Sequence, residues 1–236
     1  MKTQGTASLF ACGAAALAML TSSCATINKL DKYDIANATL AASMRVPPQP
    51  TFNIHYSVKI DAKDPIGTAF SVGTNLAKAE QAEKAEGRMR EALASVDVPE
   101  IVLRETSAAC IQALGAKKAA AKMLADYLLD LEIREYGVNA ASAGSSVSLR
   151  MHMTASLHHN RSGELVWRRD INVDNQASPD MFGGGQIVGN LVTAMALSEL
   201  SVDQLAKGFE QLAVESARSV ARRLENDLYS ARYQDR

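Results

Sequence analysis

The stretch SVSLRMHMTASLH, residues 146–158, decides the fold, because its side chains alternate between polar and apolar along its whole length. Alternation with a period of two is typical of a strand that has one buried and one solvated face. We therefore expect a long, half-buried strand here. Its buried face would carry Val147, Leu149, Met151, Met153, Ala155 and Leu157.

The segments on either side repeat this pattern. Residues 159–164 have the composition of a hairpin loop, and residues 165–174 alternate again, with Leu165, Trp167, Ile171 and Val173 on one face. Upstream, residues 126–136 also alternate, and the small residues of 137–145 indicate a loop. The three strands predict an antiparallel meander with one buried face.

The remaining elements are read outward from this meander. Residues 51–61 alternate and predict another strand, while 74–95 and 99–113 predict helices, the second ending at Gly115. Ser201 is the expected N-cap of a final helix whose apolar stripe would cover the sheet, with a charged tail from Arg222 that frays.

These elements predict an α+β fold in the order strand, helix, helix, three-strand meander, helix. The sheet would be antiparallel, with about four strands and with the helices on one face.

The N-terminus has the pattern of a bacterial signal peptide. Lys2 precedes an uncharged apolar run over residues 7–20, which is shorter than the roughly 20 residues that a transmembrane helix needs. The following Leu20-Thr21-Ser22-Ser23-Cys24 resembles the lipobox of bacterial lipoproteins, with Thr21 where the commonest form has Leu. The alternative is an ordinary cleaved signal followed by a coincidental cysteine.

The lipoprotein resemblance implies a specific modification of Cys24. A diacylglyceryl group would be attached to its sulfur, cleavage would follow Ser23, and the new N-terminus would receive a fatty acid such as palmitate. Ala25 stands where an aspartate favours retention in the inner membrane, so the resemblance implies the outer membrane, facing the periplasm, with the inner membrane as the alternative.

The expected organisation therefore has three parts. Residues 1–23 form the signal peptide, residues 24–50 a lipidated tether, and residues 51–236 a single periplasmic α+β domain. The tether prediction depends on Pro47, Pro48 and Pro50, since prolines favour an extended, semi-rigid spacer.

Composition and cysteine content set further bounds. A formal net charge of −1, with 22% charged residues, indicates no nucleic-acid partner. Cys12 leaves with the signal peptide and Cys24 carries the lipid, so Cys110 has no partner for an internal disulfide. Its apolar, helical surroundings indicate a small buried side chain.

No residue pattern predicts a catalytic, metal or cofactor site. Asp130 and Glu132 would lie about 6–7 Å apart on one strand face, which a charged solvent face explains. His152 and His158 would be about 20 Å apart and could not share a metal. Gly183–Gly185 is followed by no Lys-Ser/Thr pair, so a flexible linker is expected rather than a phosphate loop. We therefore expect a protein that is not an enzyme.

One stretch, residues 177–200, is a candidate for contact with a partner or a membrane. It combines glycines with a charge-poor apolar run, although a plain buried helix would explain the run equally well. The candidate contact residues are Phe182, Ile187, Val188, Leu191 and Val192.

Two motifs resemble known bacterial lipoproteins. They are ADYLLDLEI at residues 125–133 and SGELVWRR at residues 162–169. Together they resemble auxiliary lipoproteins of ABC-type transport systems, and also the lipoprotein domains of the curli-secretion and penicillin-binding-protein-activator types. The match covers about 50 residues and describes a hairpin, so it implies a fold and no chemistry.

This resemblance favours a membrane-anchored, non-enzymatic adaptor of a cell-envelope transport system for lipids or of the ABC type, with a protein partner in the envelope. The alternative is an oligomeric secretion or pore-forming lipoprotein that uses residues 177–200, which would make the chain a homo-oligomer. An envelope hydrolase is the third possibility.

Overall fold

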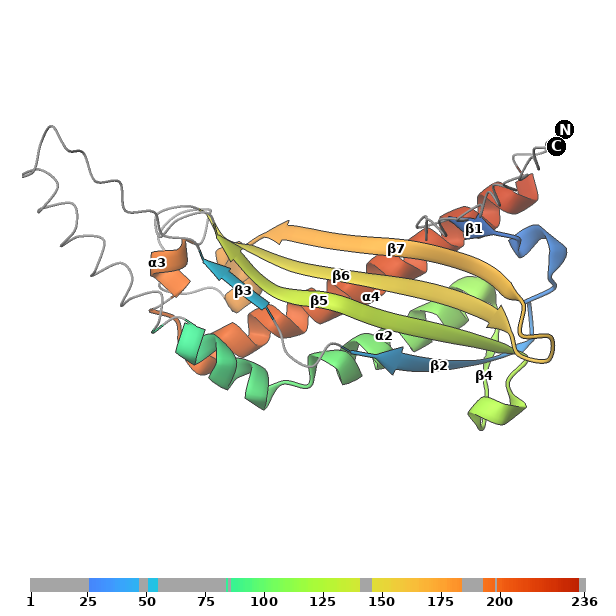
Figure 1. The fold of residues 1–236 in the computed structure, drawn as a ribbon, viewed down its shortest axis with the longest axis horizontal. Helices are drawn as coiled ribbons and strands as arrows, with labels where there is room; N and C mark the ends of the chain where they lie inside the picture. Colours follow the sequence, from blue (N-terminus) through green and yellow to red (C-terminus); the bar gives the residue numbers. More distant parts are fainter. Residues whose placement is uncertain are drawn as a thin grey trace, which may run out of the picture.

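Three long antiparallel strands form the centre of a curved sheet (Figure 1). They are β5 (Tyr127–Ala140), β6 (Ser148–His159) and β7 (Leu165–Gln176). Each pairs with the next along its length, which confirms the predicted meander. This computed structural model describes residues 26–46, 51–54, 84, 86–140, 146–183, 193–197 and 199–233.

Strand β5 continues four residues beyond Tyr136, where the alternation had predicted its end. The cause is a bulge: Ile133 lies opposite Met153 and Glu135 opposite His152, which leaves Arg134 as the extra residue. A bulge moves every later side chain to the other face of the strand. The alternation therefore breaks at the bulge although the strand does not.

The sheet has more strands than predicted and is mixed rather than antiparallel. Its order is β1-β7-β6-β5-β2-β4, and β3 pairs with β5 off this path. Both β2 and β3 run parallel to β5, and the chain reaches β5 through a connection that contains the helix Val98–Leu114. The additional strands are β1 (Ile27–Asn28), β2 (Thr39–Arg45), β3 (Thr51–Ile54) and β4 (Lys117–Lys118).

Part of the predicted tether belongs to the folded domain. Residues 26–46 supply β1, β2 and a short 3-10 helix, η1 (Leu30–Lys32). Leu30 and Leu40 are fully buried there. The prediction of a free spacer is therefore wrong for residues 26–46, and the prolines on which it depended lie outside the described residues, as do residues 55–61 of the predicted first strand.

Helix α2 (Val98–Leu114) follows a helical stretch over residues 86–95 and has well-defined ends. A carboxylate oxygen of Asp97 accepts a hydrogen bond from the backbone N–H of Glu100 at 3.0 Å, which caps its start. Gly115, with a φ of 63°, ends it in the left-handed conformation that glycine tolerates. The predicted stop at Gly115 is confirmed.

Helix α4 (Val202–Tyr233) is the longest of the described elements. The Ser201 hydroxyl accepts from the Gln204 N–H at 3.2 Å, and the Gln204 side-chain oxygen accepts from the Ser201 N–H at 3.0 Å. This reciprocal pair is a capping box, and it confirms Ser201 as the N-cap. The expected fraying from Arg222 is wrong, because the helix continues to Tyr233 and still buries Leu224 and Asp227 near its end.

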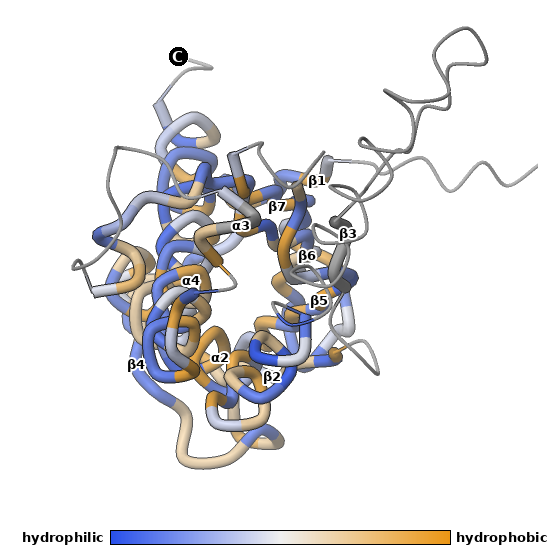
Figure 2. Tube along the Cα trace, turned by 90° about the vertical axis from the view of Figure 1, so that its left-hand side faces the viewer, coloured by the Kyte–Doolittle hydropathy of each residue, from blue (hydrophilic) through white to orange (hydrophobic). Residues whose placement is uncertain are grey.

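The core lies between the sheet and the two long helices. Helix α2 packs against β2 and β5, and α4 packs against β6 and β7. In Figure 2, α2 and α4 lie on one side and the central strands β5, β6 and β7 on the other, as expected for helices on one face of a sheet. In the described part of the chain, no helix combines the length and the apolar character needed to cross a bilayer.

Candidate functional site

Most of the predicted site residues lie outside the described part of the chain, namely Cys24, Ile187, Val188, Leu191 and Val192. Phe182 is described, and it ends the 3-10 helix η3 (Pro179–Phe182) with only 1% of its surface exposed. A Cβ atom on Gly208 of α4 would lie 2.3 Å from the Phe182 ring. Phe182 is therefore a core residue, and its prediction as a partner or membrane contact is wrong.

Three other described residues of 177–200 also pack inward, whereas Asp180, Gly183 and Glu199 are exposed. Ala177, Leu197 and Leu200 are buried, and Leu197 belongs to the short helix α3 (Ala194–Leu197). The alternative function in which this segment enters a membrane therefore depends on residues that the structure does not describe.

The carboxylates of Asp130 and Glu132 are each engaged by neighbouring side chains on the open face of the sheet. Asp130 accepts a hydrogen bond from Ser43 and lies 3.9 Å from the amine of Lys122. Glu132 lies 3.2 Å from the guanidinium of Arg45. This arrangement is that of a charged solvent face, as predicted, rather than of a catalytic carboxylate pair.

The histidines form no described site. His152 lies opposite Asn172 and Glu135 in the sheet. His158 lies toward the other end of β6, opposite Leu128 and Leu165. Among the described residues, no three His, Cys, Asp or Glu side chains gather closely enough to bind a metal.

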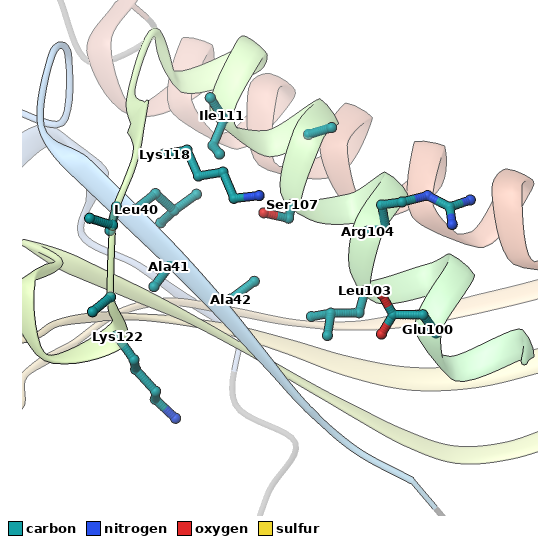
Figure 3. A pocket seen from close by; sticks show the side chains of 14 residues that line it. Leu40, Ala41, Ala42, Glu100, Leu103, Arg104, Ser107, Ile111, Lys118 and Lys122 are labelled. Atoms are coloured by element: carbon teal, nitrogen blue, oxygen red, sulfur yellow. The ribbon is translucent and has the colours of Figure 1, made fainter.

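A groove lies between β2 and α2 (Figure 3). Its volume is about 420 Å³. The connection from α2 to β5, which contains the 3-10 helix η2 (Lys122–Leu124), closes its third side. Leu40, Leu103 and Ile111 provide its apolar surface, and the small side chains of Ala41, Ala42, Ala119, Ala120 and Ala121 keep it open.

The groove exposes an edge of the sheet. The carbonyl oxygens of Ala38 and Leu40 accept hydrogen bonds from the N–H groups of Lys117 and Ala119, at 2.8 and 2.9 Å. The carbonyls of Ala38 and Leu40 therefore point away from β5. Strand periodicity gives Ala42 and Met44 the same direction. Within the described part of the chain, β4 pairs with β2 only at Thr39 and Leu40, so no described strand lies beside Ala42 and Met44 on this edge.

The rim of the groove carries more positive than negative charge. Arg104, Lys118 and Lys122 line it together with one carboxylate, Glu100. Figure 3 shows Lys118 extending across the groove toward α2. The side chains of Arg104 and Lys122 remain 59% and 55% exposed despite their contacts with neighbouring carboxylates, so both can pair with an incoming anion.

The sequence did not predict this groove, for a physical reason. Strand β2, with the sequence TLAASMR, has small residues on both faces and no alternation, so its sequence indicates no strand. The only local signal is the run KKAAAK at residues 117–122, in which small side chains between lysines leave room against a neighbouring surface.

Comparison with known proteins assigns the chain to no family. No protein-family model matches it, and no curated protein matches it. A Xanthomonas campestris protein described as DUF330 resembles it with a TM-score of 0.36 and 16% identity, over 58% of this chain and 64% of that protein, which is less than two thirds of its length.

Two other solved structures resemble the chain. A candidate lipoprotein from Caulobacter crescentus has a TM-score of 0.31 and 19% identity, over 63% of this chain and 97% of that one. A PelC dodecamer from Paraburkholderia phytofirmans has a TM-score of 0.26 and 17% identity, over 51% and 74% of the two chains. These low scores leave the function to be argued from the groove and the N-terminus.

Proposed function

We propose that this chain is a membrane-anchored, non-enzymatic lipoprotein that acts as an adaptor in a cell-envelope transport system. In this proposal it binds an extended segment of a partner protein in the groove between β2 and α2. The observation that carries the proposal is the edge of β2 at Ala42 and Met44, beside which no described strand lies and which borders the groove at Ala42. The lipobox at Cys24 supports the anchor.

An unpaired strand edge binds extended peptides by hydrogen bonding to their backbone. The N–H and C=O groups of Ala42 and Met44 would pair with the added strand. Alternate side chains of that strand would rest on Leu103 and Ile111, which are partly exposed on α2. The backbone contacts supply affinity and the side-chain contacts supply specificity.

The rim charges indicate the chemistry of the bound segment. Because Arg104, Lys118 and Lys122 outnumber Glu100, we expect a segment with carboxylates on one side and small apolar residues on the other. Exposed ion pairs contribute more to selection and association rate than to affinity. The affinity of the bound segment would therefore fall moderately with added salt.

The anchor explains how a modest groove would suffice. Attachment to the bilayer confines the domain and any membrane-bound partner to the same surface, which raises their effective concentration. Binding alone would then bring transport components together.

Site-specific cross-linking in intact cells tests this proposal. A photoreactive side chain at Ser107, which lines the groove, should cross-link to an extended, carboxylate-containing segment of one envelope protein. The matched position is Gln112, which is exposed on the same helix and outside this groove. Equal labelling from the two positions, or none from Ser107, would contradict the proposal.

A synthetic peptide of the cross-linked segment then tests the mode of binding. Its binding should slow the hydrogen exchange of the Ala42 and Met44 amides. Ala42→Pro, which removes one edge donor, should weaken binding about tenfold or more. If the peptide binds without protecting these amides, the strand-addition geometry is wrong.

A further inference from the structure

The first described residues fix the point at which the chain enters the domain. Strand β1 pairs with β7, and the N–H of Lys29 donates to the carbonyl of Val166 at 2.8 Å. The Lys29 amine also lies 2.7 Å from a carboxylate oxygen of Glu164. Ile27 is three residues from Cys24, a span of at most about 10 Å. With the acylation of Cys24 proposed above, this end of the domain would lie against the bilayer.

The 3-10 helix η2 presents two large apolar side chains to solvent. Met123 is 92% exposed and Leu124 is 72% exposed. The backbone that carries them is held in place, because the side-chain amide of Asn160 donates to the carbonyls of Lys122 at 3.3 Å and Ala125 at 2.7 Å. These contacts fix an apolar tip, Met123 and Leu124, that the core does not cover.

The apolar tip and the entry point of the chain lie at the same end of the molecule. The loop between β6 and β7 connects them, since Asn160 at its start binds η2 and Glu164 at its end binds Lys29. Figure 1 shows β1, this loop and the segment after β4 together at one end of the sheet.

Exposed positive charges lie near the apolar tip. Lys122 belongs to η2 itself, Arg161 lines the same hollow as Met123 and Leu124, and Lys117 pairs with Thr39, whose hydroxyl donates to the Leu124 carbonyl at 3.4 Å. Two nearby carboxylates are engaged within the protein: Thr39 donates to Asp126 from its backbone N–H at 2.8 Å and from its hydroxyl at 2.7 Å, and Lys29 engages Glu164. Asp31 and Asp34 are also exposed at this end, beside the 3-10 helix η1, so this end offers a facing surface more cations than carboxylates.

We propose that this end of the domain lies on an anionic lipid surface, with Met123 and Leu124 inserted among the headgroups. Insertion removes two exposed apolar side chains from water, and the cations around them attract anionic lipids. Acyl chains together with such a basic patch hold a protein on a membrane more firmly than one chain alone. The inference rests on the proposed function for the position of the anchor, whereas the tip can be tested without the anchor.

Vesicle binding by the unacylated chain tests the tip directly. Residues 24–236 carrying Cys24→Ser would be mixed with vesicles of phosphatidylethanolamine and phosphatidylglycerol, and separately with phosphatidylcholine vesicles. We expect preferential binding to the anionic vesicles and a loss of about tenfold or more in partitioning for the double variant Met123→Ser, Leu124→Ser. The control is Val46→Ser, because Val46 is 49% exposed at the far end of β2, and it should bind like the parent.

Depth-dependent fluorescence quenching by spin-labelled lipids tests the acylated protein, which begins at Cys24, in the same vesicles. A fluorophore at position 123 should be quenched strongly and one at position 46 weakly. Equal quenching at the two positions, together with equal vesicle binding by parent and double variant, would overturn the proposal. An unmodified Cys24 would refute the anchor and leave the vesicle result for the tip intact, so the two failures are distinguishable.

Discussion

Thr106 and Thr154 are buried threonines in opposite situations. In the described structure the hydroxyl of Thr106 in α2 has no hydrogen-bond partner, whereas the hydroxyl of Thr154 in β6 donates to Asp170 at 2.7 Å. A buried polar group without a partner costs about 1–3 kcal/mol.

We therefore predict that Thr106→Val raises the free energy of unfolding by about 1 kcal/mol, while the same change at Thr154 lowers it by a similar amount or more. Urea denaturation of the two variants measures both effects. A loss of stability in Thr106→Val would show that its hydroxyl has a partner after all.

Cys110 is the described cysteine, and it is buried in α2. Burial raises the pKa of its thiol to about 12, because the thiolate would lose its hydration. Native protein extracted from membranes should therefore react with iodoacetamide negligibly at mildly alkaline pH.

In denaturant the same protein should show one reactive thiol, since an acylated Cys24 has none to offer. Two reactive thiols would mean that Cys24 is retained and unmodified. A fast reaction in the native state would instead contradict the burial of Cys110.

At the scale of elements, two helical glycines respond differently to a methyl group. Gly87 is exposed and has open space around its Cβ position, whereas a Cβ on Gly208 would lie 2.3 Å from the Phe182 ring. Glycine in a helix costs about 0.5–1 kcal/mol relative to alanine.

Gly87→Ala should therefore raise the unfolding free energy by about 0.5–1 kcal/mol. Gly208→Ala should lower it by about 1–3 kcal/mol, because Phe182 must move out of its place in the core. Thermal unfolding followed by circular dichroism compares the two variants, and equal shifts would show that Phe182 does not pack on α4 as described.

The elements that sequence could predict are those with local signals. Polar and apolar residues alternate in β6 and β7 because each strand has one buried face. Gly115 marks the C-terminal end of α2, and Ser201 marks the N-terminal end of α4. Strand β2 lacks such a signal, and its parallel pairing with β5 joins residues 87 positions apart, as between Ser43 and Asp130. The groove that β2 forms with α2 could therefore not be predicted.

At the scale of the whole molecule, Asp227 connects three parts of the fold. Its carboxylate accepts a hydrogen bond from the Trp167 ring at 2.8 Å and lies 2.7 Å from the guanidinium of Arg169. Its backbone carbonyl accepts from the side chain of Asn28 at 2.9 Å. The end of α4, strand β7 and the entry of the chain are thus held together near the proposed anchor.

Asp227→Ala should lower the unfolding free energy by about 3–5 kcal/mol, because it leaves Arg169 and the Trp167 ring unpaired in a nearly dry site. Asp227→Asn should lower the unfolding free energy by less, because its amide oxygen can still accept the hydrogen bond from the N–H of the Trp167 ring. The fluorescence of Trp167, the only tryptophan, follows the unfolding in urea. Glu225→Ala, on the exposed side of the same helix, is the control and should change stability by less than about 0.5 kcal/mol.

The groove and the proposed membrane-facing end share Lys118 and Lys122. A segment bound in the groove would therefore lie close to the bilayer, which suits a partner that is itself a membrane protein. In this proposal the domain would be held directly on the membrane, whereas the tether prediction placed a spacer of residues 24–50 between the two.

The central claim is that a lipid on Cys24 holds this domain on the membrane, and intact-mass spectrometry of the protein extracted from bacterial membranes tests it most directly. The account predicts a chain that begins at Cys24 and carries the added mass of a diacylglyceryl group and a fatty acid, with both modifications lost in Cys24→Ala. A chain that retains residues 1–23, or that begins elsewhere without added mass, would contradict it.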